Sequence, residues 1–325
     1  MRLDAERTDL RHPDATPATA RNSLTDPTLT AFKLGSAVAR VVPQPAAEVS
    51  ARLAGFGISQ IATQRRGQVE RNLRRVHGPN FRGVALRRAV AATFESYARY
   101  WAESLRLPGT SPEVLDAGMS YRGYNHLEEG LAAGKGVLLA IPHLGGWEWA
   151  GFWLAEVQRR PVSVVVETLE PPEVFEWFAD LRRAFGMHVI PLGPDAGTDV
   201  VRALRANHVV CLLCDRYIGG DGGVEVEFFG ERTFLPGGPA TLALRTGAPL
   251  LPVAVYFRRH DHLGVVRPPI PAVREGRLRD DVTRVTQTIA RELEALVRAA
   301  PEQWHLLQPN WPSDPGWSRA SGGVR

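Results

Sequence analysis

Two hydrophobic patterns divide this chain of 325 residues. In its first part, apolar side chains recur every three or four positions across residues 82–105, at Leu86, Val90, Phe94, Tyr97 and Trp101. This spacing predicts an amphipathic helix. Residues 29–42 also carry apolar side chains among small ones and stop at Pro43, which cannot continue a helix. We therefore expect an N-terminal helical lobe over residues 29–108.

After this lobe, the pattern changes to short apolar runs with the length of buried strands. They lie at residues 136–141, 162–166, 189–192, 209–213 and 250–255. Helical patterns lie between or after these runs, at residues 146–157, 172–185, 198–207, 239–246 and 280–298. Such alternation favours a central, mostly parallel sheet flanked by helices. The predicted fold class is therefore α/β, with the helical lobe added at the N-terminus.

Composition sets the limits of the domains. Residues 1–28 are rich in Pro, Thr and Asp and lack the apolar segment of a secretory signal, so we expect a disordered leader. Residues 109–312 form the predicted α/β domain, and residues 313–325 a flexible tail. No stretch reaches the ~20 uninterrupted apolar residues of a membrane span. The two cysteines exclude a disulfide-stapled secreted fold.

Positive charge is concentrated in the helical lobe. Residues 52–106 contain eleven arginines and three acids, a local net charge of +8, whereas the whole chain carries +4. Each arginine near an anionic lipid surface is attracted to it by about 1 kcal/mol. No helix-turn-helix, ribonucleoprotein or zinc-finger signature accompanies these arginines, so no nucleic acid partner is expected. The lobe is predicted to face a membrane.

Several common catalytic motifs are absent or incomplete. Residues 130–136 (GLAAGKG) are one residue short of a P-loop, and the G-x-S-x-G elbow of serine hydrolases does not occur. Cys211 and Cys214 lie in one apolar run, where residues three apart on a strand point to opposite faces. We interpret them as buried structural cysteines, and we expect no metal site.

The most informative stretch is VLLAIPHLGGWEWAG, residues 137–151. A buried strand ends just before His143, at the sheet edge where α/β proteins bind ligands. Glu148 falls in the first turn of the next helix. A carboxylate bonded to one nitrogen of an imidazole leaves the other free to take a proton from a hydroxyl. The alternative interpretation is an ordinary loop histidine and a helix-capping acid.

The segment from His143 to Glu148 resembles the H-x4-[DE] signature of glycerolipid-type acyltransferases. Over about residues 32–312, the chain is similar to the lipid A biosynthesis acyltransferase family, and within it to actinobacterial phosphatidylinositol mannoside acyltransferases. Further matching segments follow in the family's order, at residues 96–108 (SYARYWAESLRLP), 181–192 (LRRAFGMHVIPL), 214–231 (CDRYIGGDGGVEVEFFGE), 236–253 (PGGPATLALRTGAPLLPV) and 303–309 (QWHLLQP).

The resemblance implies acyl transfer from a thioester to a sugar hydroxyl of a membrane glycolipid, with acyl-CoA or acyl carrier protein as co-substrate and no further cofactor. His143 is then the general base, Glu148 orients it, and no covalent intermediate forms. The family also uses a second acid, for which Glu225 is the best match and Glu227 the alternative. Both lie on one face of a predicted strand, so spacing does not choose between them.

Basic residues near this site are candidates for binding phosphate or the developing oxyanion. Arg182 and Arg183 lie near the end of a helix, where a solvated helix face is the alternative interpretation. Arg216 follows the strand of residues 209–213, at the carboxyl end where a ligand binds. We expect Asp215 to hold Arg216 through a charge-assisted hydrogen bond.

Together, these features predict a peripheral enzyme on the cytoplasmic face of the cell membrane. Its expected partners are acyl-CoA, a glycolipid acceptor and an anionic phospholipid surface. Two alternatives fit part of the pattern. An acyl thioester hydrolase uses water in place of the sugar hydroxyl, and a nonenzymatic protein binds anionic lipid through the basic lobe.

Overall fold

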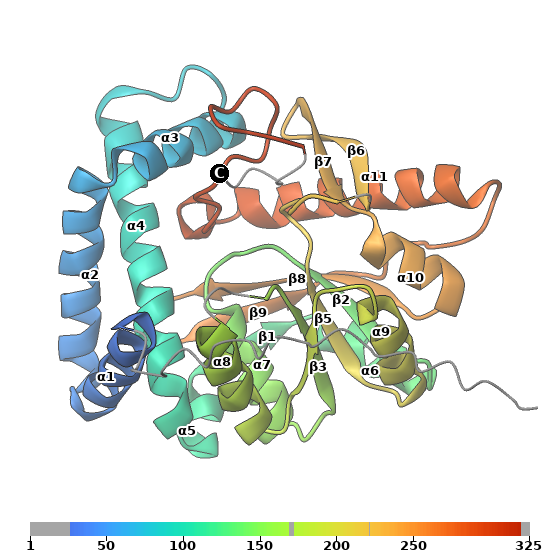
Figure 1. The fold of residues 1–325 in the computed structure, drawn as a ribbon, viewed down its shortest axis with the longest axis horizontal. Helices are drawn as coiled ribbons and strands as arrows, with labels where there is room; N and C mark the ends of the chain where they lie inside the picture. The colour runs from blue at the N-terminus through green and yellow to red at the C-terminus, as the bar shows by residue number, and fades with distance from the viewer. Residues whose placement is uncertain (1–26, 169–171, 221, 320–325) are drawn as a thin grey trace, which may run out of the picture.

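The computed structural model describes residues 27–168, 172–220 and 222–319. Its N-terminal part is a helical lobe that packs beside the rest of the molecule (Figure 1). The lobe consists of α1 (Pro27–Val41), α2 (Gln44–Ile61), α3 (Thr63–His77) and α4 (Gly83–Arg106). Most of the predicted leader lies outside the described residues, and its last two positions already belong to α1.

The remaining described residues are built on a seven-stranded sheet in the order β1-β9-β8-β2-β5-β3-β4. Neighbouring strands are parallel except for β8 and β9, which confirms the predicted α/β fold class. The strands are β1 (Met119–Arg122), β2 (Val137–Ile141), β3 (Val162–Val166), β4 (His188–Pro191), β5 (Val209–Leu213), β8 (Leu250–Phe257) and β9 (His262–Val266). The sequence pattern did not predict β1 and β9, which pair at one edge of the sheet.

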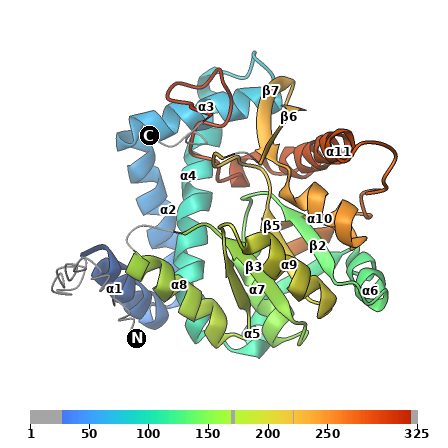
Figure 2. The same ribbon diagram turned by 45° about the vertical axis from the view of Figure 1, so that its right-hand side comes forward.

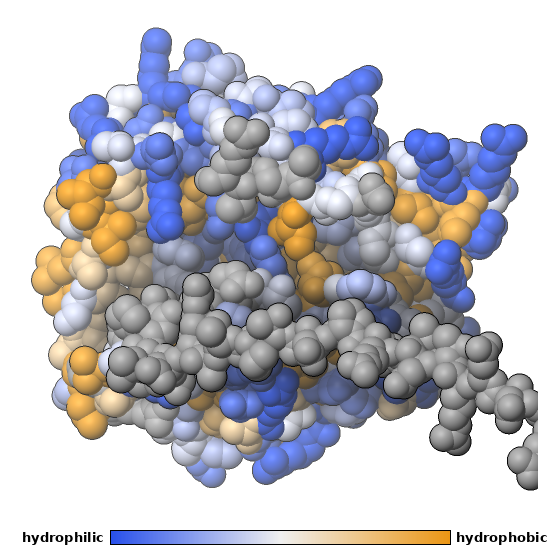
Figure 3. Space-filling view, in the orientation of Figure 1, coloured by the Kyte–Doolittle hydropathy of each residue, from blue (hydrophilic) through white to orange (hydrophobic). Residues whose placement is uncertain are grey.

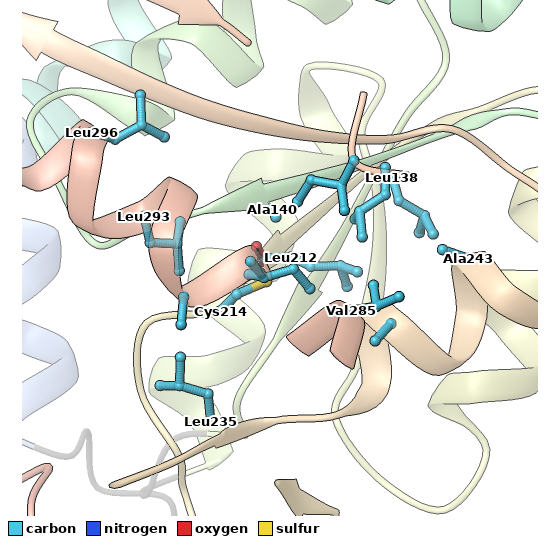
Figure 4. Packing of buried hydrophobic residues seen from close by; sticks show 14 of the residues in the cluster. Leu138, Ala140, Leu212, Cys214, Leu235, Ala243, Val285, Leu293 and Leu296 are labelled. Atoms are coloured by element: carbon cyan, nitrogen blue, oxygen red, sulfur yellow. Dashed lines mark hydrogen bonds between the residues drawn. The ribbon is translucent and has the colours of Figure 1, made fainter. Parts of the chain in front are cut away.

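Helices cover both faces of this sheet (Figure 2). They are α5 (Pro112–Ala117), α6 (Tyr124–Ala132), α7 (Trp147–Glu156), α8 (Pro172–Ala184), α9 (Ala196–Arg205), α10 (Gly238–Thr246) and α11 (Leu278–Arg298). Alternating strand residues divide between two cores. Leu138 and Ala140 of β2 pack with α9, α10 and α11, whereas Leu139 and Ile141 pack with α6 and α7. Figure 4 shows the first of these cores, where Leu212, Val285 and Leu293 come together with Leu138.

A hairpin and the C-terminal segment close one end of the domain. The hairpin consists of β6 (Gly223–Phe228) and β7 (Glu231–Pro236), and β6 packs on α11. Trp311 is fully buried and stacks on Phe228, with ring centroids 5.7 Å apart. Asp314 is also buried and accepts hydrogen bonds from the backbone N–H groups of Asn310 and Trp311. The predicted flexible tail is therefore packed into the domain at its first positions.

The surface of the lobe carries an apolar face. Helix α2 packs on α4 through the small buried residues Ala51, Gly55 and Ser59. The rest of its surface exposes larger apolar residues, which are Val49, Leu53, Phe56, Ile58 and Ile61. Figure 3 shows hydrophobic residues gathered along the edge where Figure 1 places α2. Within the described part of the chain, no helix is long and apolar enough to cross a membrane.

Candidate active site

A tight turn after β2 fixes the position of His143. Gly145 adopts a φ of +59°, and a Cβ at this position would lie 2.0 Å from the carbonyl oxygen of Val255. The adjoining Gly146 donates its backbone N–H to the same Val255 carbonyl over 3.0 Å. Because a side chain at Gly145 would collide with the backbone of β8, glycine permits this close approach. The turn thus holds His143 at the carboxyl edge of the sheet.

The carboxylate that contacts His143 belongs to Asp215. His143 Nδ1 lies 2.6 Å from Asp215 Oδ1, and the backbone N–H of His143 donates to Oδ2 over 3.0 Å. Asp215 has no exposed side-chain surface, whereas the His143 side chain is 27% exposed. The imidazole therefore joins a buried acid through Nδ1 and presents Nε2 as its remaining nitrogen.

Asp215 is itself held by residues close to the C-terminus. Trp304 Nε1 donates to Asp215 Oδ2 over 2.8 Å, and Asn310 Nδ2 donates to the Asp215 carbonyl over 3.1 Å. Burial opposes ionisation of this carboxyl group. The positive charge of a protonated His143 and the hydrogen bonds from His143 and Trp304 outweigh burial and lower the pKa of Asp215. Asp215 is therefore the ionised partner of the imidazole.

Glu148, expected to orient His143, instead forms an ion pair with Arg182 of α8. Two guanidinium nitrogens of Arg182 donate to the carboxylate, and the side chains are only 8% and 12% exposed. The expectation that Glu148 contacts His143 was therefore wrong. The register of the sheet instead brings the carboxylate of Asp215 to the imidazole. Arg183 is half exposed and pairs with Glu176 and Asp180 of its own helix. This matches the solvated helix face considered for Arg183.

Arg216 pairs with Glu167 rather than with Asp215. Glu167 follows the end of β3, the strand next to β5, so its carboxylate reaches the Arg216 guanidinium at the sheet edge. The expectation that Asp215 holds Arg216 was therefore wrong, since the carboxylate of Asp215 faces His143 and Trp304. Arg216 is 12% exposed, and it lies in the wall of the same groove as His143.

His143 opens into a groove of about 2270 Å³. This volume exceeds the roughly 300–1,000 Å³ of most small-ligand sites, so the groove has room for more than one substrate. Aromatic side chains from α4, α7 and α8 line one part of it, and they are Tyr97, Tyr100, Trp101, Trp147 and Phe178. Arginines from α9, α10 and α11 line another part, and they are Arg202, Arg205, Arg245 and Arg279.

The two acids proposed as the second acid both lie on β6, with exposed side chains. Glu225 lines the groove, and its side chain is 54% exposed and pairs with Arg232. Glu227 is not among the described residues that line the groove, and its backbone N–H bonds to Gln287. The structure thus separates two residues that strand alternation left equivalent.

Sequence reasoning missed the contribution of the segment after α11. The His143–Asp215 pair, called the dyad below, is contacted by three residues of this segment, Trp304, His305 and Asn310. The backbone N–H of His305 donates to the His143 carbonyl over 2.7 Å. His305 is buried and hydrogen-bonds Ser96 Oγ through Nε2. Burial, followed by the charge of His143, lowers the pKa of His305 to about 3. The matching segment QWHLLQP was the available signal, but it carried no indication of which partners it touches.

Neither cysteine belongs to the groove. Cys211 and Cys214 are buried free thiols that pack into different cores, as strand geometry predicted. Burial, followed by the charge of Glu148, raises the pKa of Cys211 to about 12, and burial also raises the pKa of Cys214. Within the described residues, no group of three or more His, Cys, Asp or Glu side chains is arranged to hold a metal ion.

Known proteins resemble this chain over most of its length. The sequence model of the bacterial lipid A biosynthesis acyltransferases matches residues 28–313. A phosphatidylinositol mannoside acyltransferase of Mycobacterium tuberculosis is 39% identical over 258 residues, covering 78% of this chain and 79% of that protein. The protein of the same name from Mycolicibacterium smegmatis is 38% identical over 250 residues, covering 76% and 80%. A lipid A biosynthesis acyltransferase of Haemophilus influenzae is 27% identical over 198 residues, covering 60% and 59%.

The α/β fold, the groove and these relatives define an acyltransferase. More specifically, the chain belongs to the bacterial lipid A biosynthesis acyltransferase family, whose match spans both the helical lobe and the α/β domain. The resemblance and the enzyme class predicted from the sequence are thereby confirmed.

Proposed function

We propose that this enzyme moves a fatty acyl group from a thioester, acyl-CoA or acyl carrier protein, to a sugar hydroxyl of a membrane glycolipid such as phosphatidylinositol mannoside. The observation that carries the proposal is the His143–Asp215 pair on the wall of a groove large enough for two substrates. The names of the mycobacterial relatives support the class of acceptor.

In the proposed reaction, His143 Nε2 takes the proton of the acceptor hydroxyl as its oxygen attacks the thioester carbonyl. The tetrahedral intermediate then expels the thiolate as the C–S bond breaks, and the imidazolium returns the proton to the leaving sulfur. Asp215 fixes the tautomer and stabilises the imidazolium between these steps. The raised pKa of each buried thiol disfavours a cysteinyl intermediate, which agrees with direct transfer.

Arg216 and Glu225, which line the same groove as His143, are proposed to take part in this reaction. Arg216 is a lining cation that follows β5, next to Asp215, and it is suited to stabilise the developing oxyanion. Glu225 is the second acid, because it lines the groove and Glu227 does not. Arg182 and Glu148 build the groove wall as a buried ion pair rather than contacting phosphate.

The helical lobe is proposed to contact the cytoplasmic face of the cell membrane. Helix α2 exposes apolar side chains, and Val49, Leu53 and Phe56 share one face while Ile58 and Ile61 are exposed near its C-terminal end. Exposed arginines stand on the neighbouring helices α3 and α4, and they include Arg65, Arg87 and Arg88. Apolar side chains that enter a bilayer beside arginines that contact its headgroups suit an anionic phospholipid membrane. Such binding would bring a peripheral enzyme to its lipid acceptor.

Turnover measurements test the reaction. Purified enzyme in anionic vesicles should consume palmitoyl-CoA only when phosphatidylinositol mannoside is present, and mass spectrometry should find the acyl group on the sugar. His143→Ala should lower kcat by at least about 10³-fold with unchanged folding. Consumption of palmitoyl-CoA without acceptor would instead establish a hydrolase, and near-wild-type turnover by His143→Ala would refute the base.

Vesicle cosedimentation tests the membrane face separately. Leu53→Asp combined with Ile61→Asp should release the protein from vesicles that contain anionic lipid. The matched control combines Val114→Asp with Val273→Asp, since these residues are 50% and 60% exposed on the α/β domain and neither belongs to α2. Equal binding by the α2 variant and wild type would refute the proposed contact.

A further inference from the structure

Four arginines from α9, α10 and α11 line the groove and take no part in the proposed acid–base chemistry. The lining acids of the groove are Glu148, Glu167 and Glu225, and each is paired with an arginine. The four arginines from α9, α10 and α11 do not belong to these ion pairs. Arg202 bonds Asp199 of its own helix, and Arg205, Arg245 and Arg279 form no ion pair with any described residue. The groove is therefore unbalanced toward positive charge in this part.

The position of Arg279 is not explained by helix stability. Arg205 and Arg245 lie in the last turns of α9 and α10, where the helix dipole favours a cation. Arg279 lies in the first turn of α11, where the dipole disfavours one. Since α10 packs against both α9 and α11, the helices that carry these arginines adjoin one another, and all four arginines line the same groove. Like charges placed together in a cleft attract a ligand of opposite sign.

We propose that Arg205, Arg245 and Arg279, with Arg202 beside them, form the site for the phosphate end of the thioester donor. The ligand chemistry is the phosphate of a phosphopantetheine arm, which acyl-CoA and acyl carrier protein share. Guanidinium groups bind phosphate oxygens through strong charge-assisted hydrogen bonds. This inference rests on the proposed acyl transfer and adds where the donor binds.

The layout of the groove favours the donor over the phosphate of a lipid acceptor. The aromatic part is formed by α4, α7 and α8, and α1 of the lobe packs on both α4 and α8. The arginines come from α9, α10 and the first turn of α11, and Figure 1 shows α9, α10 and the N-terminal end of α11 on the side of the molecule opposite α2. A lipid that enters from the lobe meets the aromatic part first, whereas a water-soluble donor can enter at the arginines.

Calorimetric binding to the full chain tests this site without requiring turnover. The probes are CoA and, in a separate arm, holo-acyl carrier protein. Arg245→Gln combined with Arg279→Gln should weaken binding of the natural carrier by about tenfold or more, and the effect should shrink at high salt. The control combines Arg159→Gln with Arg183→Gln, which removes the same charge from exposed positions outside the groove. The control should bind like wild type.

Kinetics then assign the site to one substrate. In the variant that combines Arg245→Gln with Arg279→Gln, the KM for the acyl donor should rise by a factor similar to the loss of binding. Its kcat and its KM for the acceptor should stay unchanged. Unchanged binding of both probes, equal weakening by the control, or no binding of either probe to wild type would overturn the inference. A raised acceptor KM with an unchanged donor KM would also overturn it. Activity retained by His143→Ala would refute the proposed reaction while leaving the binding result intact.

Discussion

His143 and Asp215 stand opposite one another because they continue the register of two hydrogen-bonded strands. Val137 of β2 pairs with Val209 of β5, and Ile141 pairs with Leu213, so paired residues are separated by 72 positions. The imidazole and the carboxylate have the same separation of 72 positions, two residues beyond the last pair. The sheet therefore aligns the dyad, and the turn at Gly145 only has to hold the imidazole there.

Asp215→Asn is expected to remove most of the activity without unfolding the protein. Asparagine keeps the size of the side chain but loses the charge that stabilises the imidazolium. We expect kcat to fall by about 10²–10⁴-fold, with little change in the KM of either substrate. Steady-state kinetics beside circular dichroism and thermal unfolding provide the measurement.

Asp314→Asn is the matched control for a general effect of losing a buried acid nearby. Asp314 pairs with Arg75 over 2.8 Å and holds the same C-terminal segment as Asp215, but it does not contact His143. Asp314→Asn should lower the free energy of unfolding, and it should reduce kcat much less than Asp215→Asn does. If the two variants lose kcat equally, or if Asp215→Asn keeps more than a tenth of it, Asp215 does not act through the imidazole.

The Glu148–Arg182 pair predicts a large cost for each single substitution. Removing one partner leaves the other as a nearly buried, unpaired charge, which costs about 3–5 kcal/mol of unfolding free energy. Glu148→Met and Arg182→Met should each show this loss, and the double substitution should recover much of it. Urea denaturation of the four proteins gives the coupling energy.

The exposed pair of Arg183 and Glu176 provides the reference for that cycle. Their side chains are 46% and 58% exposed, so solvent screens their attraction and the coupling should stay below about 1 kcal/mol. A similar coupling in the two cycles would show that burial does not govern the Glu148–Arg182 pair.

Local sequence pattern predicted most elements of the fold but could not predict the neighbours within the sheet. The apolar runs located β2, β3 and β5, yet nothing in them indicated that β5 lies between β2 and β3. Asp215 was therefore assigned to the adjacent Arg216, and Glu148 to His143, because sequence spacing and the H-x4-[DE] signature say nothing about which strands are neighbours. Short exposed strands such as β1 carry too little hydrophobic pattern to be predicted.

The packing of α2 on α4 predicts opposite outcomes at two glycines of one helix. A Cβ at Gly55 would lie 2.6 Å from the carbonyl oxygen of Phe94, so Gly55→Ala should separate the helices and cost about 1–3 kcal/mol. A Cβ at Gly57 meets nothing within 4 Å. Gly57→Ala should stabilise the helix by up to about 1 kcal/mol. Chemical denaturation tests both, and equal effects would contradict this packing.

His305 predicts a pH dependence of stability. Burial and, after it, the charge of His143 lower the pKa of this imidazole from an ordinary 6.5 to about 3. At pH values between these limits, the unfolded chain binds a proton that the folded protein excludes. The contribution of His305 to the free energy of unfolding should therefore be intact above pH 6.5. Below pH 6.5 it should fall by about 1.4 kcal/mol per pH unit, which is the slope for one titrating group.

The comparison that isolates His305 uses His305→Gln, whose amide can still bond Ser96 but does not titrate. Urea denaturation of both proteins from pH 8 to pH 5 should show wild type losing about 2 kcal/mol more than the variant. The rest of the sequence is the same in both proteins, so the difference between the two curves reports the substitution at His305. Stopping at pH 5 keeps Asp215 ionised, because its pKa lies below the ordinary value of 3.8. Parallel curves would mean that the folded protein accommodates a charged His305, so its burial beside the dyad would not exclude the proton.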